Sequence, residues 1–252
     1  MENNLFKKSY QLNNLKKIPY DSLWNTKGVF TTIRVIGKSP NFIFLKEHLN
    51  NLNKSLKKMN IDFLMNSKNF KIIVKNKFKD NVNYNHLLRI AVNNKKISIH
   101  IRKYLKPNKF FKGILVNYQR PQPNIKNLRY KKILQLLMKA KTNSSEIILY
   151  KNNNILEGCT TNIICVKKNK LYIPKNNFYF GITLKIIIKY TKRKVVKTDI
   201  LLKKLKNFDE ILLVGSGKGV VAVNNIPQIN WRNKTQNIYN ELKKLYKLRI
   251  ER

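Results

Sequence analysis

The sequence predicts a mixed α/β protein of two domains, and three observations lead to this prediction. The chain has 252 residues, close to the length at which one hydrophobic core tends to split into two. Glycine-bounded β-branched runs alternate with stretches of helical periodicity along the chain. The segment "RPQPNI" (120–125) carries two prolines within four residues and is typical of an extended linker. We therefore expect a first domain over residues 1–118, a linker over 119–125 and a second domain over 126–252.

The first domain is predicted to contain antiparallel strands and at least one helix. The sequence "KEHLNNLNKSLKKMNI" (46–61) places leucines and a methionine at helical spacing and predicts an amphipathic helix. Alternating residues on both sides of Asn93 and Asn94 predict a hairpin. Apolar runs predict the strands, which are 28–37, 41–45, the two arms of 86–104, and 113–119.

The second domain is predicted to combine strands around tight turns with three helices. Apolar runs that are bounded by Asn or Gly predict strands within 145–150, 162–174 and 209–223. Apolar residues at helical spacing predict helices over 128–141, 182–193 and 234–246.

The composition is strongly basic, with 53 Lys plus Arg, 12 Asp plus Glu and a formal net charge of +41. Such a charge raises the possibility of nucleic-acid binding, because Lys and Arg neutralise phosphates. The basic residues are mostly Lys, spread evenly and accompanied by many Asn and Ile, a composition that is typical of AT-biased genomes. Arg and aromatic residues do not gather on one stretch, so specific nucleic-acid binding is the remote alternative.

Other classes receive little support from the sequence. Cys159 and Cys165 are too few for a disulfide framework, and the three scattered histidines give no metal-ligand spacing. No run of 18 apolar residues occurs, and the N-terminal residues lack the apolar segment of a signal peptide. We therefore expect a cytoplasmic protein with no metal site and no membrane partner.

Four features of the second half form a set that can carry chemistry. Lys126 follows the predicted linker, and Glu157 closes an apolar strand before the small polar run "GCTTN". "GIT" (181–183) opens a predicted helix, where free backbone N–H groups suit a phosphate. "VGSGKG" (214–219) is a glycine turn that offers a second possible nest of N–H groups. Singly, these features are better explained by surface charges, a helix cap and a strand turn.

In this order and spacing, the features resemble the class IV aminotransferases, which are pyridoxal 5'-phosphate (PLP) enzymes of fold type IV. The resemblance covers nearly the whole chain and rests on "GVFTTIRVIG", "EHLNNLNKS", "NIKNL", "LEGCTTNI", "YFGIT" and "DEILLVGSG". It implies two α/β domains with PLP in the cleft between them, a small amino-acid-like substrate and a homodimer.

The resemblance also implies roles for individual residues. Lys126 matches the lysine that binds the cofactor aldehyde and moves a proton at the substrate α-carbon. Glu157 matches the carboxylate that faces the pyridine nitrogen and keeps it protonated. The residues expected to bind the cofactor phosphate are Ile182, Thr183, Ser216 and Gly217.

The first-domain helix departs from the family pattern. The family usually has an Arg there, within His-Leu-x-Arg-Leu, to hold the phosphate, whereas "HLNNL" places Asn51 at this position. Lys54 lies one turn away on a similar face, so we expect it to restore part of the charge. A lysine does so as a point charge, without the two-pronged geometry of Arg. In addition, "GIT" is followed by Leu184, where the family commonly has Arg.

The string "FTTIRV" (30–35) most resembles the 4-amino-4-deoxychorismate lyases of this family. That resemblance predicts elimination of pyruvate to give 4-aminobenzoate for folate synthesis, with Phe30 and Arg89 contacting the substrate. A branched-chain or D-amino acid transaminase is the alternative, because the Gly-Arg-rich loop of some lyases is replaced here by the short turn "NNKKIS" (93–98). Arg89 is equally well explained as an exposed strand residue.

Overall fold

The computed structural model describes residues 4–79 and 82–251, which form two compact units. Unit 1 contains the described residues up to Tyr104 together with Ile125–Lys131. Unit 2 contains Leu105–Asn124 and the described residues from Lys132 onward. These bounds differ from the domain bounds expected from the sequence, because the chain enters unit 2 before the predicted linker and returns briefly to unit 1 around Lys126.

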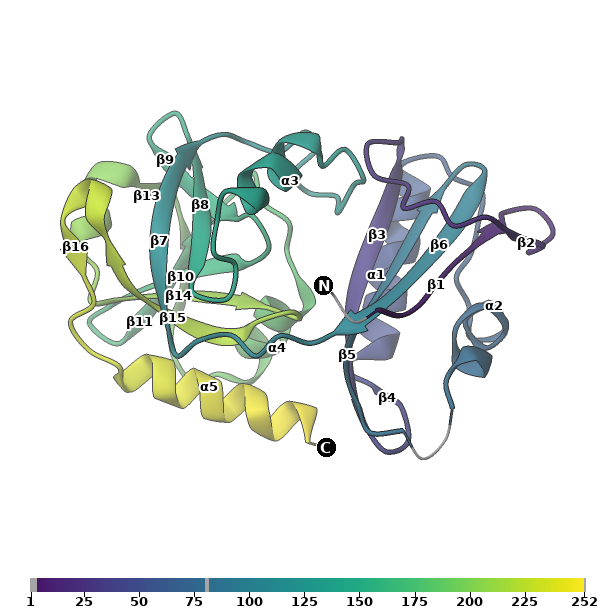
Figure 1. The fold of residues 1–252 in the computed structure, drawn as a ribbon. Helices are drawn as coiled ribbons and strands as arrows, with labels where there is room; N and C mark the ends of the chain where they lie inside the picture. Colours follow the sequence, from purple (N-terminus) through teal and green to yellow (C-terminus); the bar gives the residue numbers. More distant parts are fainter. Residues whose placement is uncertain (1–3, 80–81, 252) are drawn as a thin grey trace. The chain divides into compact units, whose positions relative to one another are not determined.

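Unit 1 is built on a six-stranded sheet with the strand order β2-β1-β6-β5-β3-β4 (Figure 1). Every pair of neighbouring strands in this sheet is antiparallel, as expected. The strands are β1 (Asn4–Gln11), β2 (Lys17–Ile18), β3 (Gly28–Gly37), β4 (Asn41–Phe42), β5 (Tyr84–Asn93) and β6 (Lys96–Lys103). The helices are α1 (Leu45–Lys58), α2 (Ser67–Ile73) and a short 3-10 turn at Lys75–Lys77.

The local sequence of unit 1 explains its central elements. Helix α1 buries Leu49, Leu52 and Leu56 in the core of the unit, which confirms the amphipathic helix. The β5–β6 hairpin is confirmed, and the Asn93 side chain stabilises its turn by accepting hydrogen bonds from two following backbone amides. The strand expected over 41–45 is wrong beyond residue 42, because Phe44 adopts a left-handed conformation and the helix begins directly after it.

Unit 2 is built on a ten-stranded mixed sheet with the order β12-β11-β10-β14-β15-β7-β8-β9-β13, and β16 pairs with β15. Strand β7 lies parallel to both of its neighbours, β15 and β8, in the middle of this sheet. The strands are β7 (Phe110–Asn117), β8 (Ser145–Lys151), β9 (Asn154–Gly158), β10 (Asn162–Lys167), β11 (Lys170–Pro174), β12 (Val195–Thr198), β13 (Ile200–Leu201), β14 (Glu210–Gly215), β15 (Gly219–Ile226) and β16 (Trp231–Arg232).

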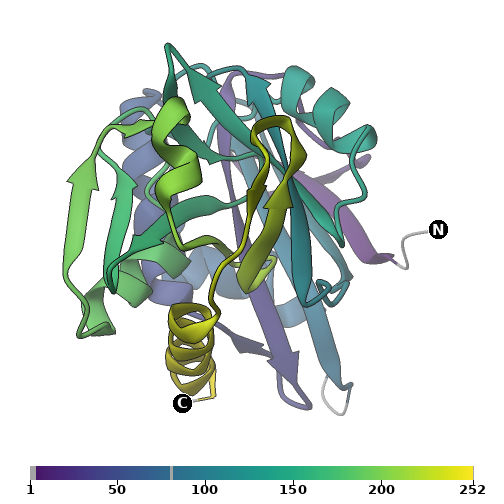
Figure 2. The same cartoon turned by 90° about the vertical axis from the view of Figure 1, so that its left-hand side faces the viewer.

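Three helices complete unit 2: α3 (Lys131–Met138, which starts at the unit boundary), α4 (Ile182–Tyr190) and α5 (Asn237–Ile250). Two 3-10 helices lie at Leu202–Asn207 and Pro227–Ile229. Helix α5 contacts β14, β15 and α4, and the two views show it beside these elements (Figures 1 and 2). In the described part of the chain, no helix combines the length and the apolar character needed to span a membrane.

The N-terminus of α5 is fixed by a buried glutamate. The Glu210 carboxylate, on β14, accepts hydrogen bonds from the Ile238 and Tyr239 amides at 3.0 and 2.7 Å and from the Thr235 hydroxyl at 2.7 Å. A carboxylate is stabilised there because the first amides of a helix lack intrahelical acceptors and carry the positive end of the dipole. Unit 2 therefore uses a buried acid to attach a helix to its sheet.

Candidate active site

Lys126 is held against the first residues of β3 within unit 1. Its carbonyl oxygen accepts a hydrogen bond from the Phe30 amide at 2.9 Å. Two residues further on, the Leu128 amide donates to the Gly28 carbonyl at 2.8 Å. A Cβ atom on Gly28 would come within 2.4 Å of the Val92 carbonyl oxygen, so only glycine allows this close approach. The short pairing fixes the backbone of the lysine, and its ammonium lies over the Phe30 ring, 5.0 Å from the ring centroid.

Three aromatic side chains of unit 1 pack against one another and form an aromatic wall that includes Phe30. The Trp24 and Tyr130 rings are stacked with centroids 5.3 Å apart, and the Phe30 ring meets both edge-on at 5.0 and 5.2 Å. Phe30 and Tyr130 are buried. The rings provide a flat apolar surface, and the Phe30 ring lies next to the amine of Lys126.

Arg89 extends this wall with a positive charge. Its guanidinium lies over the Trp24 ring at 4.3 Å and donates to the Ser22 carbonyl at 3.0 Å and to the Tyr20 hydroxyl at 3.3 Å. The residue is only 8% exposed, which excludes the exposed strand arginine that the sequence left open. Its Nε atom is buried and has no hydrogen-bond partner, so a donor remains for another group.

A neutral histidine lies in the same unit as Lys126. His48, on α1, is buried, and its Nδ1 shares a hydrogen bond of 2.8 Å with the Thr31 hydroxyl. Burial and the positive charge of Lys126 lower the pKa of His48 to about 3. The imidazole therefore adds no positive charge near the lysine at neutral pH.

The helix that carries His48 also contains the two residues expected near the phosphate. Asn51 is half-buried, and its carbonyl accepts a hydrogen bond from the Ser55 hydroxyl at 2.8 Å. Lys54 is exposed. Unit 1 thus holds five of the residues singled out in the sequence: Phe30, Asn51, Lys54, Arg89 and Lys126.

Glu157 lies in unit 2, at the end of β9, and is 4% exposed. Its Oε1 accepts a hydrogen bond from Arg120 Nε at 2.7 Å, and its Oε2 accepts one from the Tyr179 amide at 3.1 Å. Arg120 is equally buried and also donates to the Pro123 carbonyl at 2.9 Å. The charge of the carboxylate is therefore compensated inside the unit, as a buried ion requires.

The N-terminus of α4 is fixed by Asn162. The Asn162 Nδ2 donates to the Tyr179 carbonyl at 2.5 Å, and its Oδ1 accepts from the Gly181 amide at 3.0 Å. A Cβ atom on Gly181 would come within 2.7 Å of that Oδ1, so glycine is needed where the chain turns into the helix. Asn162 and Glu157 thus hold the same segment, residues 179–181, from two sides.

The first turn of α4 carries donors that suit a phosphate. Ile182 and Thr183 are the first two residues of the helix, where backbone amides lack intrahelical acceptors. The N-cap residue, Gly181, has no side chain that could cap these amides. The Thr183 residue is only 1% exposed, yet its buried hydroxyl has no hydrogen-bond partner. A buried unsatisfied hydroxyl at a helix N-terminus indicates a site for an acceptor group.

Ser216 and Gly217 lie in the tight turn that joins β14 to β15, also in unit 2. The Lys218 amide donates to the Gly215 carbonyl at 3.0 Å, and Gly219 adopts a positive φ of 67°, which closes the turn. Unit 2 thus holds the other five predicted residues: Glu157, Ile182, Thr183, Ser216 and Gly217.

The two cysteines of unit 2 are poor nucleophile candidates. Cys159 and Cys165 are buried free thiols. Burial raises the pKa of both thiols, and for Cys159 the nearby Glu146 and Glu157 carboxylates raise the pKa further. Because the thiolate is the reactive form, both side chains act as small apolar groups.

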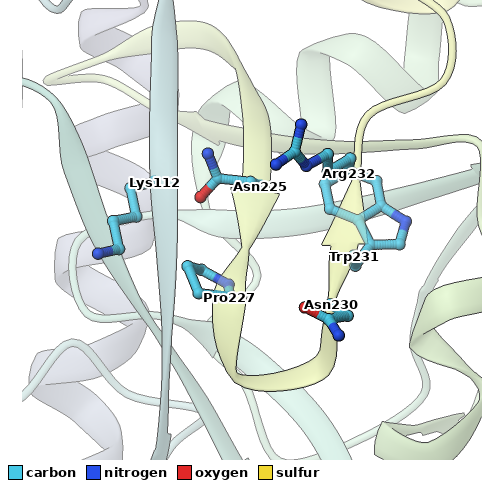
Figure 3. Close-up of a pocket in the computed structure, with 6 residues that line it drawn as sticks. All are labelled: Lys112, Asn225, Pro227, Asn230, Trp231 and Arg232. Atoms are coloured by element: carbon cyan, nitrogen blue, oxygen red, sulfur yellow. The ribbon is translucent and has the colours of Figure 1, made fainter.

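Unit 2 also has a surface pocket, and none of the candidate site residues described above lines it (Figure 3). Three of its residues are register partners across three neighbouring strands, Lys112 on β7, Asn225 on β15 and Arg232 on β16. Its lining residues are Lys112, Asn225, Pro227, Asn230, Trp231 and Arg232. None of them was a predicted site residue.

Sequence reasoning missed Arg120, Asn162 and His48. Arg120 stands in the proline-containing segment that was interpreted as a linker, and in a chain with 53 basic residues one more cation carries little information. Asn162 received no role of its own, although an Asn between a small polar run and an apolar strand is a common signal for a side chain that fixes a turn. His48 was visible in the "HLNNL" motif, but without a partner at motif spacing it indicated no role.

The comparisons with known proteins identify the family. Residues 28–226 match the family model described as amino-transferase class IV. Among curated protein sequences, none matches the chain.

Solved structures share the fold. A Legionella pneumophila protein, provisionally assigned as a 4-amino-4-deoxychorismate lyase, is 20% identical with a TM-score of 0.76, covering 88% of this chain and 91% of its own. The branched-chain aminotransferase of Thermoproteus uzoniensis is 16% identical with a TM-score of 0.79, covering 95% and 93%. A hypothetical aminotransferase of Mycobacterium tuberculosis in its PLP-bound form is 15% identical with a TM-score of 0.73, covering 97% and 99%.

The match of the family model extends over most of the chain, and the two units have the mixed α/β fold of these structures. The chain belongs to the class IV aminotransferase family and is an enzyme whose cofactor is pyridoxal 5'-phosphate.

Proposed function

We propose that the protein is a 4-amino-4-deoxychorismate lyase, which releases pyruvate from its substrate and leaves 4-aminobenzoate for folate synthesis. The observation that carries this proposal is the aromatic wall of unit 1, formed by Trp24, Phe30 and Tyr130, whose Phe30 ring lies next to the Lys126 ammonium. A planar carboxylated ring stacks on such a wall better than a short aliphatic side chain does. Arg89, on Trp24, supplies a cation for the ring carboxylate.

The residues of unit 2 fit the cofactor. The unpaired Thr183 hydroxyl and the first amides of α4 suit the PLP phosphate, and the Ser216–Gly217 turn provides further donors. Glu157 already accepts one hydrogen bond on each oxygen, but an ionised carboxylate has about four lone-pair sites, so it can accept another from a pyridinium N–H. When bound, PLP supplies the electron sink that makes the substrate carbon acidic.

Each residue of the chain has a defined task in this proposal. Lys126 Nζ would hold the cofactor through its aldehyde, and this amine, once free, would take the proton from the ring carbon that carries the substrate amine. The electrons of that C–H bond complete the aromatic ring as the C–O bond to the enolpyruvyl group breaks. A proton returned to the enolpyruvate carbon gives pyruvate, and no oxidant is consumed. Arg120 keeps Glu157 oriented, and Arg89 holds the substrate.

A branched-chain or D-amino acid transaminase is the second candidate. The observation that favours it is the short β5–β6 turn after Asn93, which replaces the Gly-Arg-rich loop of some lyases. In this case the aromatic wall would contact an apolar side chain of the amino-acid substrate, and Arg89 would bind the α-carboxylate of that substrate.

The product distribution separates the two candidates. Purified protein with PLP and aminodeoxychorismate is expected to release pyruvate and 4-aminobenzoate in equal amounts without any 2-oxo acid. Turnover of branched-chain or D-amino acids only when a 2-oxo acid acceptor is present would identify the transaminase instead. Arg89→Gln is expected to raise KM by about tenfold or more because it removes a charge-assisted contact, whereas the exposed Arg232→Gln serves as the control.

We further propose that the protein acts in the cytoplasm as a homodimer, as its resemblance to the family implies. Light scattering of the purified protein tests the dimer: a mass of about 60 kDa supports it, since one chain has a mass of 29.9 kDa, and a monomer that is fully active would contradict it.

A further inference from the structure

A third buried carboxylate of unit 2 accepts hydrogen bonds from the loops that the proposed function assigns to the cofactor. Glu146, on β8, is 1% exposed. Its Oε2 accepts hydrogen bonds from the Lys218 ammonium at 2.8 Å, the Thr160 hydroxyl at 2.7 Å and the Thr161 hydroxyl at 3.3 Å. One oxygen atom therefore gathers donors from two different loops.

The two loops are those that follow Glu157 and that carry Ser216. Thr160 and Thr161 belong to the β9–β10 turn, and Lys218 belongs to the β14–β15 turn. The turns approach each other closely, because a Cβ atom on Gly215 would lie 3.1 Å from the Thr160 carbonyl oxygen. Glu146 thus connects two segments that are 58 residues apart in sequence, as the numbers of Thr160 and Lys218 show.

The ion pair is buried and directed inward. The side chains of Lys218 and Glu146 are 11% and 0% exposed, and the Lys218 ammonium lies 4.6 Å from the centroid of the buried Phe111 ring. Leaving one member of such a pair without its partner is costly, because the remaining charge has no water to solvate it. The turn that carries Ser216 is therefore fixed to the core of the unit by its lysine rather than by its backbone alone.

We infer that the Glu146–Lys218 ion pair is the positioning device that fixes residues 215–219, and with them the Ser216 and Gly217 donors, for binding the cofactor phosphate. This inference rests on the proposed use of PLP by the site. Lys218 acts through the turn and not by contact with the phosphate, because its ammonium is bound to Glu146. A binding turn must be held to within about 0.5 Å for its hydrogen bonds to form fully.

The test compares PLP with pyridoxal, which lacks the phosphate, in titrations of the cofactor-free full chain. Lys218→Met keeps an apolar stem on Phe111 and removes the ammonium. It is expected to weaken PLP binding about tenfold or more while changing pyridoxal binding by less than about threefold. Lys218→Arg is expected to restore most of the PLP affinity. The matched control is Lys234→Met, which removes a lysine from the exposed ion pair with Asp209 and should alter neither affinity.

A double variant separates positioning from general stability. Glu146→Gln combined with Lys218→Met removes both buried charges and is expected to melt nearer to the wild-type temperature than Lys218→Met alone. In the double variant, the ratio of PLP affinity to pyridoxal affinity should be as low as in Lys218→Met alone. If Lys218→Met left the ratio of PLP affinity to pyridoxal affinity at its wild-type value, the inference would be overturned and the proposed function would remain intact. A wild-type protein that binds neither compound would overturn both.

Discussion

The two units differ in the kind of charge that they bury. Unit 1 buries Arg89 and the neutral His48, and each of its described carboxylates, Asp21, Glu47 and Asp62, is at least partly exposed. Unit 2 buries three glutamates, Glu146, Glu157 and Glu210, in a chain with only 12 acidic residues.

The buried charges do different things in the two units. In unit 2 each buried glutamate connects separate segments: Glu210 holds a helix, Glu146 holds two turns and Glu157 holds the segment before α4. In unit 1 the Lys126 amine lies beside the Phe30 ring, and none of the described carboxylates of this unit is buried. In the proposed function, unit 2 binds the phosphate and the ring nitrogen of the cofactor, and unit 1 carries the lysine that reacts.

The largest expected effect comes from removing the cation that compensates Glu157. Arg120→Met leaves this carboxylate buried with the Tyr179 amide as a remaining donor and should lower the free energy of unfolding by about 3–5 kcal/mol. Urea unfolding of the cofactor-free protein measures this. The matched control is Arg193→Met, in the half-exposed pair with Glu241, which should cost less than about 1 kcal/mol. Equal costs for the two variants would show that burial does not distinguish the pairs.

The next effect concerns the chemical role of Glu157. Glu157→Gln keeps an acceptor for Arg120 but removes the negative charge opposite the pyridine nitrogen, so kcat should fall about 100-fold with PLP still bound. Glu157→Ala is a less informative variant, because it would also leave Arg120 buried without its carboxylate partner. Full activity of Glu157→Gln would remove this residue from the chemistry.

A smaller effect depends on pH and belongs to unit 1. His48 has a pKa of about 3 in the folded state, below its usual value near 6.5, so the unfolded state binds the proton first as pH falls. Stability is therefore lost progressively from about pH 6.5 toward pH 3, by about 2 kcal/mol at pH 5. Urea unfolding at pH 7 and pH 5 measures the fall in the free energy of unfolding between the two pH values. This fall should be about 2 kcal/mol smaller in His48→Gln than in the wild type. His86→Gln, at a half-buried site, should change it less, and identical pH profiles for wild type and His48→Gln would contradict the neutral buried state.

The smallest effect concerns Lys54. Because it is exposed and offers a point charge in place of the family arginine, Lys54→Ala should weaken PLP binding only about two- to fivefold. The loss should shrink at high salt, since exposed charges are screened. Lys58→Ala, on the same helix, is the control. An unchanged PLP affinity in Lys54→Ala would show that this lysine does not restore the missing charge.

Local patterns made much of the fold predictable. The β5–β6 hairpin followed from alternation around Asn93, and α1 followed from leucines at helical spacing. Strand β1 was missed because "NLFKKSYQ" has few apolar residues, and it forms a strand through pairing with β6, which local sequence does not reveal. The sequence did not predict that residues 126–128, directly after the expected linker, pair with β3, since proline signals an extended chain but not its partner.

The sequence singled out candidate residues by their scarcity or by their position. Glu157 stood out because acids are scarce, and Thr183 because it opens a helix. Arg120 and Lys218 were hidden among many basic residues, and only their burial beside carboxylates distinguishes them. Glu146 was interpreted as the start of an apolar strand, because the threonines that bind it lie 14 and 15 residues away.

The central claim is that PLP is bound through Lys126, and it can be tested by reducing the PLP-loaded protein with borohydride and mapping the modified peptide. We predict one reduced cofactor per chain, attached at Lys126, and none in Lys126→Ala, with the exposed Lys131→Ala behaving as wild type. A wild-type protein that remains colourless after PLP is added, or a label spread over several surface lysines, would contradict the account.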